Sequence, residues 1–222
     1  MQISPYRKHC KKLRPLLFWG LLLCAFIVSG VYIYNDLATP LTTHTATDIT
    51  SDTPPQTEPP TAEAKANHKV PPQNPKYLII PKLSVNTNIQ AMGVTAQGAI
   101  DAPKTAWDVG WYQNGTLPGS GSGAALIDGH VNDAFNTPGV FSELPNLSKG
   151  DDVIIIRGDD SRLTYKVVDT VSQPLKDIDM EKMLHSADPS KEGLNLITCG
   201  GRYDKTTKTY SDRIVVFTMR VG

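Results

Sequence analysis

Apolar residues in the C-terminal two thirds of the chain fall into short runs that turn-forming residues separate. The runs 153–156 and 214–217 are rich in β-branched residues, which suit buried strands. The predicted strands are Tyr77–Ile80, Asn88–Val94, Val109–Tyr112, Ala124–Asp128, Asp152–Arg157, Leu163–Val171, Leu194–Cys199 and Ile214–Arg220. Eight strands with one or two short helices predict a mostly β fold, a closed eight-stranded barrel.

One helix is predicted around residues 179–185. Asp179 is its expected N-cap, and Met180, Met183 and Leu184 share one face. His185 lies near the end of this helix, where a histidine is favourably placed against the helix dipole. We therefore interpret His185 as structural.

The N-terminal part has a different pattern. Residues 16–34 contain no charge, and a helix of that length reaches about 30 Å, roughly the thickness of a bilayer core. A basic segment, 1–15, precedes this run and predicts a cytoplasmic N-terminus, with the chain after Asn35 outside the cell. A cleaved signal peptide and a buried globular helix are the alternatives, but the run exceeds a usual signal core and no clear Ala-x-Ala site follows.

Residues 35–75 are dominated by Thr and Pro and contain almost no large apolar residue after Leu41. Such a segment cannot bury enough apolar surface to offset its ordering entropy. We predict a disordered stalk, followed by one folded domain over residues 76–222.

Charge excludes some classes of partner. The chain has 22 basic and 22 acidic residues, and the part from Lys76 onward is close to neutral. That part contains no basic block that would indicate nucleic-acid binding and no acidic tail that would indicate a cationic partner. We expect a monomer.

Cys199 is the only cysteine in the exported part, because Cys10 falls in the cytoplasmic segment and Cys24 in the anchor. An internal disulfide is therefore excluded there, and a thiol facing an oxidising environment is a liability unless it is buried or used. Cys199 ends an apolar strand and is followed by Gly200 and Gly201, which allow close approach of another backbone. A catalytic cysteine and an inert buried one both remain open.

A cysteine nucleophile needs a partner that favours its thiolate. His44 and His68 lie in the predicted stalk and are expected to be solvated. His130 follows a predicted strand through Gly129, a position that presents a side chain well, although a structural histidine is the alternative.

Arg213 opens the last predicted strand, where we expect its guanidinium at the rim of the fold. Acyl transfer to a thiolate places negative charge on a carbonyl oxygen, which a fixed donor stabilises. The alternative is an ion pair with Asp212 or another aspartate.

Together these residues resemble the sortase family. His130, then Leu196-x-Thr198-Cys199, then Arg213 match that family's order and rough spacing, and Asn195 stands where a Thr is common. The segments 80–85, 127–130 and 212–217 also match, so the resemblance covers about residues 76–222. Length and the stretch from Trp107 to Trp111 look most similar to class F sortases.

The resemblance implies a sortase-type barrel and a transpeptidase. Cys199 would attack the Thr–Gly bond of a Leu-Pro-x-Thr-Gly-like sorting signal on a secreted protein, and a cell-wall amine from a peptidoglycan precursor or stem peptide would resolve the thioester. His130 would be the general acid and base and Arg213 the oxyanion donor. Thr198 would help to position the substrate or the oxyanion.

Some sortases bind calcium in the region that corresponds to residues 172–193. Here Asp177, Asp179 and Glu181 lie close together in sequence, and we interpret them as the capped start of a helix. No metal or cofactor is therefore expected.

Two other enzymes and one binding module are the alternatives. An L,D-transpeptidase typically reads Ser-His-Gly-Cys-x-Arg, which Thr198-Cys199-Gly200 lacks, and a papain-like protease places its cysteine before its histidine. A noncatalytic β-domain, displayed on the stalk to bind a wall polymer or a protein, would leave Cys199 without a chemical role.

Overall fold

A computed structural model describes residues 60–222. The predicted cytoplasmic segment, the predicted anchor 16–34 and the predicted stalk up to residue 59 lie outside them. Within residues 60–222, no helix has the length and apolar character to cross a membrane.

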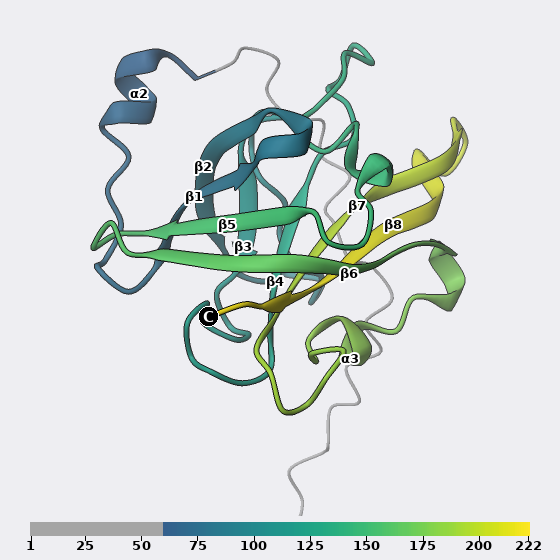
Figure 1. Cartoon of the computed structure of the whole chain (residues 1–222). Coiled ribbons are helices and arrows are strands. Elements are labelled where there is room, and N and C mark those ends of the chain that lie inside the picture. The colour runs from purple at the N-terminus through teal and green to yellow at the C-terminus, as the bar shows by residue number, and fades with distance from the viewer. Residues whose placement is uncertain (1–59) are drawn as a thin grey trace, which may run out of the picture. The chain divides into compact units, whose positions relative to one another are not determined.

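Eight strands form a closed barrel in the order β1-β2-β3-β4-β7-β8-β6-β5, with β5 returning to β1 (Figure 1). Most neighbours are antiparallel, while β2–β3 and β4–β7 are parallel. The strands are β1 Pro75–Ile80, β2 Val85–Met92, β3 Val109–Tyr112, β4 Ala124–Gly129, β5 Asp152–Arg157, β6 Arg162–Pro174, β7 Gly193–Asp204 and β8 Thr209–Arg220. The predicted mostly β fold, a closed eight-stranded barrel with few short helices, is confirmed.

The predicted strands match the observed ones best where apolar runs are short and sharply bounded, as in β3 and β5. The prediction ended β7 at Cys199 because Gly200-Gly201 is a turn signal. The β7–β8 ladder in fact continues to Asp204↔Thr209, past an irregularity between Gly200 and Tyr203. Gly201, with φ +74°, adopts the left-handed conformation that lets the ladder resume.

Residues 60–74 correct the predicted end of the stalk, because they pack against the barrel. Helix α2, Ala62–Ala66, is capped by the Thr61 hydroxyl. The Tyr77 hydroxyl donates to the Lys65 carbonyl over 3.1 Å, and His68 Nε2 donates to the Ile89 carbonyl over 2.9 Å. The prediction of a solvated His68 is therefore wrong. The local composition gave no sign of this hydrogen bond, because its acceptor lies on β2, a distant segment of the chain.

Two apolar clusters lie on the two faces of the sheet. The larger cluster fills the barrel and includes Leu196 of β7 and Val216 of β8. The smaller cluster covers the outer face and includes Ile197 and Val215. Ile197 follows Leu196 on β7, and Val215 precedes Val216 on β8. Because side chains alternate along a strand, odd-numbered residues of this part of β7 and β8 face outward.

Helix α3, Met180–Met183, covers the outer face (Figure 1). Its N-cap is Asp179, as predicted, with the carboxylate accepting from the Glu181 and Lys182 N–H groups. His185 Nδ1 donates to the Glu181 carbonyl over 2.6 Å, which supports its structural interpretation. The buried Asn195 amide donates to the Met183 carbonyl over 2.7 Å and so ties β7 to the end of this helix. Three 3-10 turns complete the described elements: η1 Pro81–Leu83, η2 Leu144–Asn146 and η3 Leu175–Asp177.

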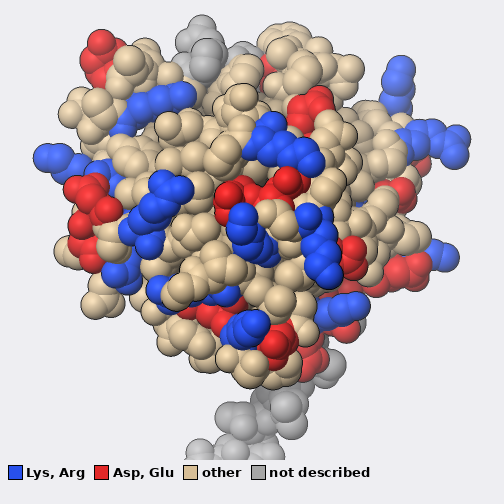
Figure 2. Space-filling model, in the orientation of Figure 1, with Lys and Arg blue, Asp and Glu red and all other residues tan. Residues whose placement is uncertain are grey.

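Acidic and basic side chains are interspersed over the face of the molecule that carries β5 and β6 (Figure 2). Lys82 pairs with Asp151 over 2.8 Å and Lys166 with Asp152 over 2.8 Å. Exposed pairs of this kind contribute little to stability. No single sign of charge dominates the face that Figure 2 shows.

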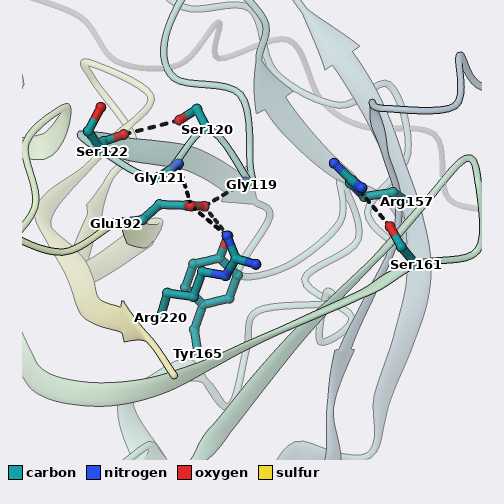
Figure 3. Close-up of polar contacts among 9 residues, drawn as sticks. All are labelled: Gly119, Ser120, Gly121, Ser122, Arg157, Ser161, Tyr165, Glu192 and Arg220. Atoms are coloured by element: carbon teal, nitrogen blue, oxygen red, sulfur yellow. Dashed lines mark hydrogen bonds and ion pairs between the residues drawn. The ribbon is translucent and has the colours of Figure 1, made fainter. Parts of the chain in front are cut away.

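A buried carboxylate, Glu192, joins the start of β7 to three other parts of the chain (Figure 3). It accepts hydrogen bonds from the Gly119 and Gly121 N–H groups, over 2.6 and 2.9 Å. It also accepts from the Tyr165 hydroxyl over 2.5 Å and from the Arg220 guanidinium over 3.1 Å. Burial alone would raise the pKa of Glu192, but these four donors outweigh burial and lower it.

We predict that Glu192→Gln lowers the free energy of unfolding by about 2 kcal/mol at neutral pH, because charge-assisted bonds become neutral ones. A carboxylate with a lowered folded-state pKa stabilises the fold above its ordinary pKa of 4.5 and loses that effect as the pH falls through the folded value. Urea denaturation at pH 7 and at pH 3 should therefore show a difference between the two proteins that shrinks in acid. The exposed Glu143→Gln serves as control, and equal stability of all three proteins at pH 7 would contradict the prediction.

Candidate active site

Strand pairing brings Cys199 and Arg213 together, although 13 residues separate them in the chain. They are direct partners in the antiparallel β7–β8 ladder, so their Cα atoms lie about 5 Å apart. Strand β4 runs parallel to β7 on its other side, with Asp128 opposite Ile197. His130 follows the last residue of β4, and the same register extended by two residues would place it beside Cys199.

All three side chains belong to the outer face of the sheet. Cys199 is two residues from Ile197, and Arg213 is two residues from Val215, both members of the outer cluster. His130 is likewise four residues from Leu126 of that cluster. The alternation of the strands therefore gathers the predicted nucleophile, base and donor on one surface.

The segment that crosses above β3 orients the His130 ring. Its Nε2 lies 2.8 Å from the Pro103 carbonyl oxygen, which can only accept, so Nε2 carries the hydrogen. In the neutral ring Nδ1 is then the basic atom. Burial lowers the pKa of His130, against a smaller opposing effect of the Pro103 hydrogen bond, so the ring is a neutral base near pH 7.

Arg213 is fully buried, which corrects the prediction that its guanidinium lies at the rim. Its Nη1 donates to the carbonyls of Tyr210 and Asp212, over 3.3 and 3.0 Å. Within residues 60–222 it forms no ion pair, and its buried Nε and Nη2 atoms have no hydrogen-bond partner. Because leaving such donors unsatisfied costs about 1–3 kcal/mol each, this geometry favours an incoming acceptor over the alternative ion pair with an aspartate.

Thr198 belongs to the inner face and is almost fully buried. Its hydroxyl donates to the Gly129 carbonyl over 2.7 Å. That bond holds the peptide immediately before His130 against β7, one residue from Cys199. The hydroxyl therefore points away from the outer face, which favours an indirect positioning role for Thr198 through Gly129.

Asp128 is a buried carboxyl on the outer face, in the segment 127–130 that resembles sortases, and no role was predicted for its side chain. Burial raises the pKa of Asp128 well above its usual value, a hydrogen bond to its own backbone opposes that shift, and the Asp101 carboxylate adds to it. An acid at the buried end of an otherwise apolar strand was the signal that could have marked it. Its side chain approaches Gly110 so closely that a Cβ there would lie 2.5 Å from Oδ1.

The acidic residues near α3 show no arrangement suited to a metal ion. Across residues 60–222, no group of His, Cys, Asp and Glu has the spacing of a metal site. Asp179 uses its carboxylate as the helix cap instead.

Comparison with known proteins identifies the class and then the family. A sheet face with a half-buried cysteine, a half-buried histidine and a buried arginine defines a candidate cysteine acyl-transfer centre. A sortase-domain family model matches residues 78–221, so the chain belongs to the sortase family and is a sortase-type cysteine transpeptidase. No curated protein sequence gives a significant match.

Solved structures support the fold. A lid mutant of sortase A from Corynebacterium diphtheriae is 22% identical with a TM-score of 0.52, covering 72% of this chain and 76% of its own. Group B Streptococcus pilus island 1 sortase C2 is 20% identical (TM-score 0.51), covering 70% of this chain and 77% of its own. Streptococcus pneumoniae sortase C is 19% identical (TM-score 0.51), covering 76% and 75%. These sortases A and C lend no support to the class F resemblance.

We predict that Thr198→Val costs about 1 kcal/mol of stability and lowers turnover several-fold, because the peptide before His130 loses its anchor. Thr218→Val is the matched control, since the Thr218 hydroxyl makes a similar buried bond to the Leu194 carbonyl at the other end of β7. Thermal unfolding should show similar losses in both variants, and only Thr198→Val should lose activity. Equal turnover in the two variants would contradict the anchoring role.

Proposed function

We propose that this chain is a membrane-anchored sortase that cleaves a Leu-Pro-x-Thr-Gly-like sorting signal between Thr and Gly and transfers the protein to a cell-wall amine. The observation that carries the proposal is the direct pairing of Cys199 with the buried Arg213, next to His130 on the same face. A face with only a cysteine would support a binding module equally well.

Cys199 is the proposed nucleophile and His130 its acid and base. The thiol proton passes to Nδ1 as sulfur bonds to the threonine carbonyl carbon. When the tetrahedral intermediate collapses, the C–N bond to glycine breaks and the departing nitrogen takes that proton from His130. An amine then attacks the thioester, gives its proton to His130, and releases the thiolate, which recovers the proton.

Arg213 is the proposed donor to the oxyanion of each tetrahedral intermediate. Its Nε and Nη2 hydrogens are buried and already fixed by the bonds of Nη1 to two carbonyls. Donors that need no reorganisation stabilise developing charge most effectively in a site with little water. We assign Thr198 a positioning role instead of a substrate contact, because its hydroxyl is bonded to Gly129.

The proposed location is the cell membrane, with a single span over residues 16–34 and the catalytic domain outside the cell. What supports it is the uncharged run itself and the basic residues before it. Residues 35–59 would then separate the span from α2. The proposed substrates are secreted proteins with a C-terminal sorting signal, and the proposed acceptor is an amine of the peptidoglycan precursor or stem peptide.

The protein should form a covalent adduct with a Leu-Pro-x-Thr-Gly peptide, because the thioester forms before the amine arrives. Intact-mass spectrometry should show the mass of the protein plus the peptide up to Thr, and added amine should convert the adduct to the transfer product. Cys199→Ala should give neither species. Peptide that binds both proteins equally and is never cleaved would favour the noncatalytic binding module instead.

Arg213→Lys should reduce kcat about 100-fold or more with a small change in KM. The ammonium keeps the charge but cannot present two donors in the fork geometry of a guanidinium. Steady-state kinetics with the same peptide measure this, and Arg202→Lys, an exposed position on β7, is the matched control. Turnover of Arg213→Lys equal to that of the control would remove Arg213 from the mechanism.

A further inference from the structure

Tyr210 of β8 contacts both sides of the candidate active site. Its hydroxyl donates to Asn132 Oδ1 over 3.0 Å, and Asn132 is two residues after His130. Its own carbonyl accepts from Arg213 Nη1 over 3.3 Å. One residue therefore links the segment that carries the base to the side chain that carries the oxyanion donors.

The segment that Tyr210 holds is a closed loop with His130 at its base. The Phe141 N–H donates to the His130 carbonyl over 3.0 Å, and the Gly139 N–H donates to the Val131 carbonyl over 2.9 Å. Inside the loop, Asn132 Nδ2 donates to Asn136 Oδ1 over 2.7 Å. Because these bonds close the base of the loop, a shift in the position of Asn132 would also shift the backbone of His130.

The Tyr210 hydroxyl also lies within electrostatic reach of the nucleophile. Burial raises the pKa of Tyr210, the hydrogen bond with Asn132 opposes the shift, and negative charge on Cys199 and on Tyr203 raises it further. The hydroxyl therefore stays protonated at neutral pH and remains a donor to Asn132.

We propose that Tyr210 is a positioning residue, whose hydroxyl bond to Asn132 sets the place of His130 relative to Arg213 and Cys199. The proposal rests on the proposed function and adds to it a residue that does not touch the substrate. The proposed effect comes from the hydroxyl bond and is separate from the packing of the Tyr210 ring. The ring of Tyr210 already packs against Tyr203, with centroids 5.1 Å apart, and that contact does not involve the hydroxyl.

The test compares Tyr210→Phe, Asn132→Ala, the double variant and the matched control Tyr203→Phe, which removes a hydroxyl from the other ring of the same pair. We expect each of the first two changes to lower kcat about tenfold, the rate equivalent of one hydrogen bond, with KM within about twofold. The double variant should be no slower than the slower single variant, because both changes break the same bond. Tyr203→Phe should behave as wild type.

A second readout separates positioning from folding. The rate at which iodoacetamide alkylates Cys199 across pH reports the coupling of the thiol to His130 without any peptide, and we expect its pH profile to shift in Tyr210→Phe but not in Tyr203→Phe.

A kcat of Tyr210→Phe within twofold of wild type, an effect confined to KM, an unshifted alkylation profile, or losses that multiply in the double variant would each overturn the proposal. If Tyr210→Phe fails to fold, Asn132→Ala is compared with Asn136→Ala, which removes only the bond between Asn132 and Asn136, and equal kcat values in these two variants would overturn the proposal. Inactive wild-type protein would count against the proposed function itself, whereas active wild type with a wild-type-like Tyr210→Phe counts only against the role of Tyr210.

Discussion

The pairing of β7 with β8 is the constraint on which the site depends. It sets Cys199 opposite Arg213, and the parallel pairing of β7 with β4 brings His130 to the other side. A slip of one residue in either ladder would turn a side chain to the opposite face, because the period of a strand is two. Closure of the barrel prevents such a slip, since every strand is held by two neighbours. The far end of β7 is fixed in addition by Glu192, which holds the 119–121 loop, Tyr165 and Arg220 together.

The electrostatics of the site follow from burial. Arg213 lies inside the protein without a carboxylate partner among the described residues, so part of its hydrogen-bonding capacity is unused. Unsatisfied buried donors destabilise the free protein, and a bound ligand or a tetrahedral intermediate supplies the missing acceptor. Burial also lowers the pKa of His130, which favours its neutral form. One base and several fixed donors on a dry face are what acyl transfer through a thioester needs.

Local sequence predicted the parts of this structure that local chemistry determines. Short apolar runs predicted the bounds of β3 and β5, and Asp179 marked the start of α3. Cys199 stood out because it is the only cysteine after residue 24. What failed depended on contacts between distant segments. The burial of Arg213 comes from packing on the outer face, and the hydrogen bond of His68 comes from a segment whose composition suggested a stalk. The continuation of β7 past two glycines depends on β8 as its partner.

The residues that sequence reasoning missed share this cause. Asn132 and Tyr210 belong to no motif, and no role was predicted for the Asp128 side chain within its motif; each gains its significance from a neighbour on another strand or loop. Side chains alternate along a strand, so residues 197 and 199 share one face of β7 and residues 213 and 215 share one face of β8. Only the register of the two strands shows that these are the same face. The register itself is a long-range property, so the face could be assigned only from the structure.

The most direct measurement is a crystal structure of the protein with a sorting-signal peptide analogue joined covalently to Cys199. The account predicts the analogue on the outer face, its carbonyl oxygen within hydrogen-bonding distance of Arg213 Nε or Nη2, and His130 Nδ1 directed at the sulfur. An analogue whose carbonyl oxygen lies away from Arg213, or an imidazole directed away from the sulfur, would contradict it.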